Sequence, residues 1–181
     1  MAGPAFDANG AVRFDLRNGS ASDARGARLL VVPAAAIEAL DAASREKLGS
    51  EIGKACGARV AARLGGDGGV RNAQLEVVVS HLAGELAIAG VGAVHLERWG
   101  RAMVAIVTNP GAGDEGFLAG AVGAAIGSAS GRDLAAASLG KQGNTVRFFL
   151  GSRATCDKVK GAVAQGKGHA EILAGLQGAQ P

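Results

Sequence analysis

Small and apolar residues recur at helical spacing between Ala34 and Leu64, which predicts a long helix with an interruption near Asp41–Ser44. Residues four apart lie on one face of a helix. The predicted helix carries a row of glycines at this spacing beside a row of larger apolar residues. The two rows are Gly49, Gly53 and Gly57, and Leu48, Ile52, Cys56 and Val60.

The glycine row predicts that this helix packs closely against another backbone. Each glycine in a helix interior costs about 1 kcal/mol relative to alanine, so three on one line indicate a compensating close approach. The partner that we favour is the same helix of a second copy of the chain. The predicted dimer interface is Leu48, Gly49, Ile52, Gly53, Cys56 and Gly57.

The rest of the chain alternates between helical and strand patterns. Helices are expected at Asn72–Ala89, Phe117–Ser128, Arg153–Gln165 and His169–Gln177, and hairpins at Ala93–Arg98 with Ala102–Thr108 and at Asp133–Leu139 with Thr145–Leu150. The alternation in Val12–Leu16 is typical of an edge strand or a loose arm, a short strand is expected at Leu29–Val32, and Gly65–Gly69 is expected to be a turn or a flexible loop. The order helix, helix, hairpin, helix, hairpin, helix predicts an α+β fold whose antiparallel sheet is covered by helices on one side.

Composition narrows the class of protein. Of the 181 residues, 48% are hydrophobic and 19% charged, which excludes a disordered chain. The net charge of +3 is spread without a basic cluster and aromatic residues are 3%, so nucleic-acid binding is not expected. No apolar run approaches the roughly 20 residues of a membrane span. Without a signal-peptide pattern, the expected location is the cytoplasm.

Five stretches of the sequence, in the order of the predicted helices and hairpins, resemble the transport-protein-particle (TRAPP) components and their prokaryotic relatives, the 4-vinyl-reductase-type domains. They are Leu48–Gly53, Gly90–Gly92, Met103–Pro110, Gly116–Gly120 and Gly143–Leu150. The resemblance spans residues 28–152. Residues 1–27 are then an N-terminal arm, and residues 153–181 are a C-terminal helical extension outside the resemblance.

The resemblance implies a non-enzymatic module that pairs through its first helix, and that either binds a hydrophobic ligand or builds a larger assembly. It also implies a more distant possibility, regulation of a small GTPase. Prokaryotic relatives often carry a cysteine before the third helix and two in the last hairpin. This chain has Asp114 and Glu115 near the first place, and Leu139 and Thr145 around the others, so a metal site is not implied.

Gly111–Gly116 spells the G-x-G-x-x-G pattern of dinucleotide-binding proteins. Pro110 and the carboxylates of Asp114 and Glu115 argue against a phosphate site, because a pyrophosphate needs positive potential there. The favoured interpretation makes Asp114 a helix N-cap. His81, His95 and His169 share no metal-ligand spacing with Cys56 or Cys156, and His81 is expected to face solvent.

The tip of the first predicted hairpin carries the only tryptophan between two arginines, as Arg98, Trp99 and Arg101. Tryptophan and arginine are enriched in binding hot spots, so these three residues are candidate partner contacts. The alternative is that Trp99 folds back over the sheet. In Phe148–Phe149 one ring points to each face of a strand, so one is core and the other needs cover or is exposed.

Together these patterns predict a cytoplasmic, bacterial-type, non-catalytic homodimer that serves as an interaction scaffold or regulatory subunit, with an unidentified protein partner and no cofactor. The alternative is a sensor for a hydrophobic small molecule or acyl chain, enclosed between the first two helices and the sheet. A dinucleotide-binding protein is the most distant alternative.

Overall fold

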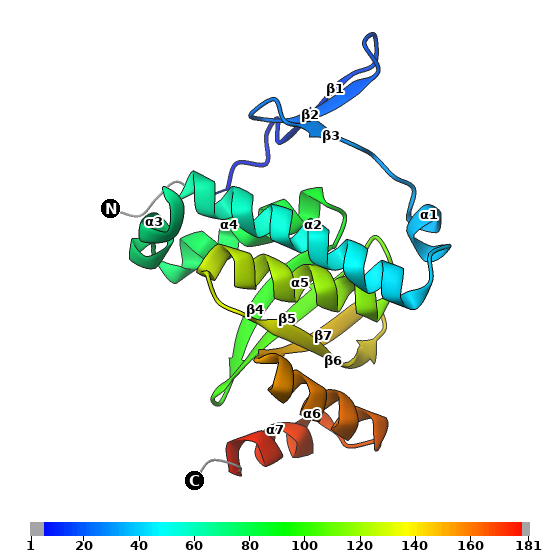
Figure 1. Cartoon of the computed structure of the whole chain (residues 1–181), viewed down its shortest axis with the longest axis vertical. Helices are drawn as coiled ribbons and strands as arrows, with labels where there is room; N and C mark the ends of the chain where they lie inside the picture. The colour runs from blue at the N-terminus through cyan, green and yellow to red at the C-terminus, as the bar shows by residue number, and fades with distance from the viewer. Residues whose placement is uncertain (1–5, 179–181) are drawn as a thin grey trace.

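The computed structural model describes residues 6–178 and is built on one four-stranded antiparallel sheet (Figure 1). The strands are β4 (Ala93–Trp99), β5 (Ala102–Thr108), β6 (Ala135–Gln142) and β7 (Thr145–Gly151), in the order β4-β5-β7-β6. Both sequential pairs are hairpins, and β5 joins them by pairing with β7 from Met103↔Leu150 to Thr108↔Thr145. The predicted α+β class and both predicted hairpins are confirmed.

Three helices cover one face of this sheet: α2 (Ala42–Arg63), α4 (Leu75–Ile88) and α5 (Glu115–Ser130). The interruption predicted near Asp41 is present, because α1 (Ala34–Glu38) ends there and α2 begins. The Asp41 side chain accepts a hydrogen bond from the Ser44 amide at 2.9 Å and caps α2. A side-chain oxygen at the N-cap satisfies an amide that has no partner within the helix.

The other face of the sheet is covered too, by α6 (Arg153–Ala164) and α7 (His169–Gly178), as Figure 1 shows. The prediction of a sheet covered on one side is therefore wrong. Successive strand residues point to opposite faces, and both faces are apolar here. Phe148 lies in the core beneath α5, whereas Phe149 lies in a second cluster with Val159 and Ile172 of the C-terminal helices.

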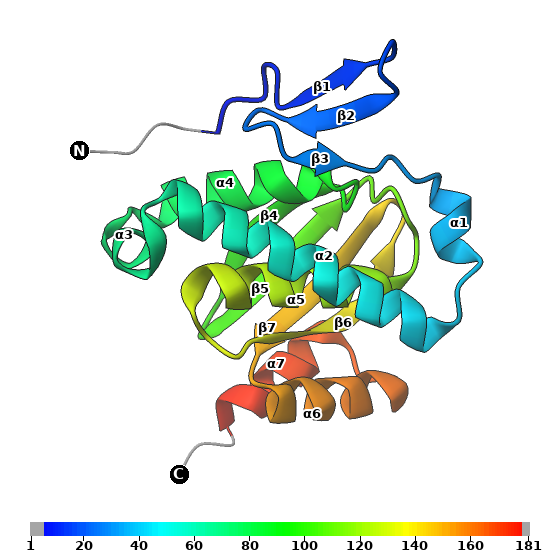
Figure 2. The same ribbon diagram turned by 45° about the horizontal axis from the view of Figure 1, so that its top comes forward.

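The N-terminal arm forms a separate small sheet of β1 (Val12–Asp15), β2 (Ser20–Asp23) and β3 (Arg28–Leu29), which lies beside the helical layer in Figure 2. The strand predicted at Leu29–Val32 is only partly present. Leu29 pairs with Ala21, but Leu30 and Val31 follow in an extended link with 87% and 67% of their surfaces exposed.

The glycine run after α2 is helical rather than a loop, because α3 spans Gly66–Asn72. The backbone turns sharply into it at Gly65, whose φ of 90° is in the left-handed region that favours glycine. A Cβ at Gly69 would lie 1.5 Å from the carbonyl oxygen of Leu64. The run therefore permits a tight turn between two helices.

Candidate functional site

The glycine row of α2 meets the backbone of α5 in the same chain. A Cβ added at Gly49 or Gly53 would lie 2.1 Å from the carbonyl oxygen of Phe117 or Ala121, respectively. At Gly57 the nearest atom would be the Ala125 carbonyl oxygen at 2.3 Å. These are steric conflicts, so only glycine fits. The two helices run parallel at this contact, which we call the α2–α5 seam (Figure 2).

The seam corrects the predicted dimer interface. The close backbone approach is present, but its partner is α5 of the same chain, and Gly49, Gly53, Cys56 and Gly57 are buried by it and by the neighbouring core. Leu48 and Ile52 also pack against this core. The glycine row, which we predicted to face a second copy of the chain, therefore packs against another helix of the same chain.

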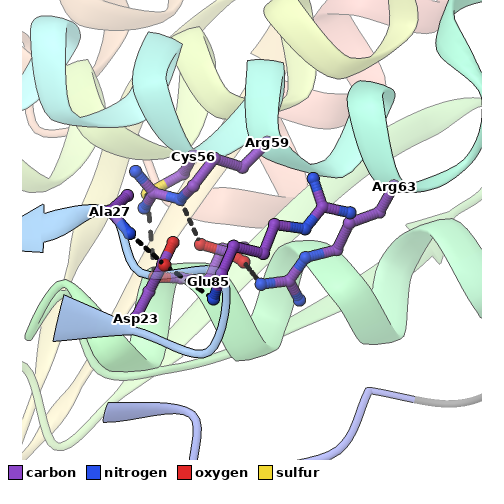
Figure 3. Close-up of polar contacts among 7 residues, drawn as sticks. Asp23, Ala27, Cys56, Arg59, Arg63 and Glu85 are labelled. Carbon is purple, nitrogen blue, oxygen red and sulfur yellow. Dashed lines mark hydrogen bonds and ion pairs between the residues drawn. The ribbon is translucent and has the colours of Figure 1, made fainter. Parts of the chain in front are cut away.

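A buried ionic cluster joins α2 to α4 (Figure 3). Glu85 of α4 is 2% exposed. Each of its two carboxylate oxygens pairs with a different guanidinium group. Arg59 Nε lies 2.5 Å from Oε2, and Arg63 Nη2 lies 2.6 Å from Oε1. A carboxylate this deeply buried needs such partners to offset its loss of hydration.

The same cluster reaches the N-terminal arm (Figure 3). Asp23 of β2 is 6% exposed and accepts hydrogen bonds from the amides of Arg25 and Ala27, each at 2.9 Å. The guanidinium carbon of Arg63 lies 5.4 Å from the centre of the Phe6 ring. The arm thus contacts α2 and α4 through the Phe6 ring, and its Asp23 carboxylate interacts electrostatically with Arg59.

The histidine and the cysteine near this cluster are both buried. His81, predicted to face solvent, is 7% exposed, because the arm covers it and Phe6 meets its ring edge-on at 6.0 Å. Burial raises the pKa of the Cys56 thiol to about 11. Since the thiolate is the reactive form, Cys56 is a poor nucleophile near neutral pH.

The helix that follows the G-x-G-x-x-G segment is capped by a carboxylate of this chain. The Asp114 carboxylate accepts a hydrogen bond from the Phe117 amide at 2.8 Å, which confirms the predicted N-cap. It also pairs with Arg45 at 3.1 Å. The preceding strand, β5, is antiparallel to both of its neighbours, whereas the dinucleotide fingerprint belongs to parallel βαβ units.

The three residues at the first hairpin tip have different surroundings. Trp99 folds back on the sheet, where it is half-buried against the second cluster, the one that contains Phe149, and its Nε1 donates to Glu97 Oε2 at 2.7 Å. Arg98 is exposed and donates to the carbonyl oxygen of Gly100 at 3.2 Å. Arg101 lies on the wall of a pocket.

This pocket, which we call the C-terminal pocket, lies between the sheet and the helices α6 and α7. Its volume is about 620 Å³, within the range of roughly 300–1,000 Å³ typical of small-molecule sites. Most of the residues that line it are apolar. They include Met103 and Phe149 from the sheet, Val159 from α6, and Ile172 and Leu176 from α7.

The polar groups of the C-terminal pocket are mostly cations. Arg101, Lys158 and Lys167 are exposed at its edge, and we call them the rim cations. Among the residues that the structure describes, Glu171 is the one carboxylate in the lining, and it lies 3.9 Å from Lys167. Thr155 adds a hydroxyl group. The pocket therefore offers an apolar interior and a positive edge.

Within residues 6–178, no group of three or more His, Cys, Asp and Glu side chains is placed to hold a metal ion. None of the helices described there has the length and apolar character that a membrane crossing requires.

A similar fold occurs in a solved structure, the phenol-responsive sensory domain of the transcription activator PoxR with phenol. The TM-score is 0.55 and the sequence identity is 14%, over 85% of this chain and 90% of that one. Identity this low shows a shared fold alone. No family model and no curated protein matches the chain, so the TRAPP and 4-vinyl-reductase resemblance stays a prediction.

The C-terminal pocket was not predicted from the sequence, and among its lining residues only Arg101 was named as a candidate. Its walls come from segments that are distant along the chain, the start of β5, the end of β7 and the two last helices. The Glu85 cluster was also missed, although Arg59 and Arg63 gave a signal. Like charges four apart on a helix repel each other, which indicates an anion between them.

Proposed function

We propose that this chain is a non-enzymatic module that binds a small molecule with an apolar body in the C-terminal pocket. The observation that carries the proposal is the pocket itself, with its apolar walls from the sheet, α6 and α7. The fold shared with a phenol-responsive sensory domain supports a sensor more than a scaffold. The location differs from our expectation of a site between the first two helices and the sheet.

Gly175→Leu tests the site by filling it. Gly175 lines the pocket, and a Cβ added there meets nothing within 4 Å. The leucine therefore has room beside the pocket without a clash, and leucine also favours the helix over glycine. We expect native mass spectrometry to find a co-purified or added apolar ligand on the wild type, and at least tenfold less on the variant.

Gly161→Leu is the matched control. Gly161 lies on α6, has no atom within 4 Å of an added Cβ, and is outside the pocket lining. This variant should retain ligand like the wild type. Equal ligand occupancy in the wild type and Gly175→Leu would contradict the pocket as the binding site, as would a wild type that binds no apolar compound.

A second candidate function, self-assembly, has its own supporting observation. The N-terminal arm and the link that follows it expose the large apolar side chains of Phe14, Leu16, Leu30 and Val31, at 62%, 88%, 87% and 67%. Neighbouring exposed apolar residues are typical of interfaces. We propose that this arm surface contacts a second copy of the chain, which retains the predicted homodimer but transfers its interface from the glycine row.

The double variant Leu30→Ser and Val31→Ser tests this assembly. In sedimentation equilibrium, the wild type is expected at twice the mass of the chain, and the variant at the mass of one chain. Leu75→Ser is the control, because Leu75 is 62% exposed but lies on α4 outside the arm. A monomeric wild type, or a variant that remains dimeric, would refute the arm surface as a dimer contact.

A further inference from the structure

The charges around the C-terminal pocket are unbalanced. Three cationic groups, Arg101, Lys158 and Lys167, line it against the single carboxylate of Glu171. Glu171 and Lys167 are 3.9 Å apart and both well exposed. An exposed pair of this kind has a small interaction energy, so it leaves Lys167 available to a ligand.

The rim cations come from three separate parts of the chain. Arg101 lies at the turn between β4 and β5, Lys158 on α6, and Lys167 between α6 and α7. Lys158 shares its helix with Val159, which lies in the apolar wall. All three lie at the exposed edge of the pocket, which therefore carries more positive than negative side chains among the residues that the structure describes.

We propose that the ligand of this pocket is an anionic amphiphile, in which a carboxylate or similar headgroup joins an apolar body. This rests on the proposed function and adds the headgroup to it. The apolar body lies against Met103, Phe149 and Ile172, and the headgroup lies at the positively charged edge of the pocket. Arginine and lysine at the rim favour an anion by charge and by hydrogen bonding.

The test compares decanoate with 1-decanol, which has the same apolar body and no charge, each below its micelle-forming concentration. Trp99 is the only tryptophan and the chain has no tyrosine. Its cross-strand partner, Ala102, lines the pocket, so Trp99 fluorescence reports binding nearby. We expect decanoate to bind at least fivefold more tightly than decanol, with a preference that falls as salt is added.

Variants that remove single positive charges identify which side chains cause the preference for decanoate. Lys158→Gln should weaken decanoate binding by roughly two- to fivefold, as expected for one cation near the surface, and leave decanol binding unchanged. Lys158→Gln combined with Arg101→Gln should remove most of the preference. Lys160→Gln is the control, because Lys160 is two residues away on the same exposed helix but outside this pocket.

The outcomes separate this inference from the proposed function. Equal binding of decanoate and decanol, both blocked by Gly175→Leu, would overturn the anionic headgroup and keep the pocket. Binding of neither would overturn both. A chain that cosediments with phosphatidylglycerol vesicles but binds no free decanoate recognises a membrane surface, which would also overturn the inference.

Discussion

Gly53→Ala is expected to destabilise the folded chain, although alanine is the better helix former. The new methyl group would lie 2.1 Å from the Ala121 carbonyl oxygen, at a contact between two backbones. Backbone cannot rotate away as a side chain can, so α2 and α5 must separate. We expect the free energy of unfolding to fall by about 2 kcal/mol or more, despite a helix-propensity gain of about 1 kcal/mol, as measured by urea denaturation.

Gly161→Ala is the matched control for this substitution. Gly161 is also a helical glycine, but an added Cβ meets nothing within 4 Å. This variant should be more stable than the wild type by up to about 1 kcal/mol. If both variants were stabilised, the α2–α5 seam would be looser than the structure shows. If the Gly53→Ala variant kept its stability but was monomeric where the wild type is dimeric, the glycine row would instead pack against a second copy of the chain.

Glu85→Gln is expected to cost about 3 kcal/mol, toward the low end of the range for a broken buried ion pair. The amide keeps the shape of the side chain but leaves the guanidinium groups of Arg59 and Arg63 without their anion. Arg59 retains 30% of its side-chain exposure, so water relieves part of the penalty. Urea denaturation of the wild type and the variant measures the difference.

Glu51→Gln is the comparison for the buried carboxylate. Glu51 pairs with Lys54 at 2.8 Å, but both side chains are more than half exposed. Removing this charge should leave the unfolding midpoint unchanged within error. Equal effects of the two substitutions would show that the Glu85 cluster contributes no more than a surface pair.

Local patterns predicted the parts of the fold that depend on neighbours in the sequence. The N-cap at Asp114 and the pairing of Ala93–Trp99 with Ala102–Thr108 follow from capping chemistry and strand alternation. The adjacent rings of Phe148 and Phe149 predicted one ring in the core and left the other to be either covered or exposed. The sequence did not say that α6 and α7 cover the second face, because that choice depends on tertiary packing.

Contacts between distant segments limited the prediction of the site. The glycine row correctly predicted a close backbone approach, but a pattern within one helix cannot tell another helix of the chain from a second copy. His81 was misplaced for a related reason, since the arm that buries it lies about 75 residues earlier in the sequence, at Phe6. The C-terminal pocket needs four such segments to meet, and only Arg101 among its residues had a local signal.

The α2–α5 seam also restricts how this protein can move. Glycines at intervals of four face carbonyl groups at intervals of four, on Phe117, Ala121 and Ala125. Sliding by one to three residues would drive side chains into those carbonyls, and the next matching register is about 6 Å away. A response to a ligand is therefore expected to leave the register of these two helices unchanged.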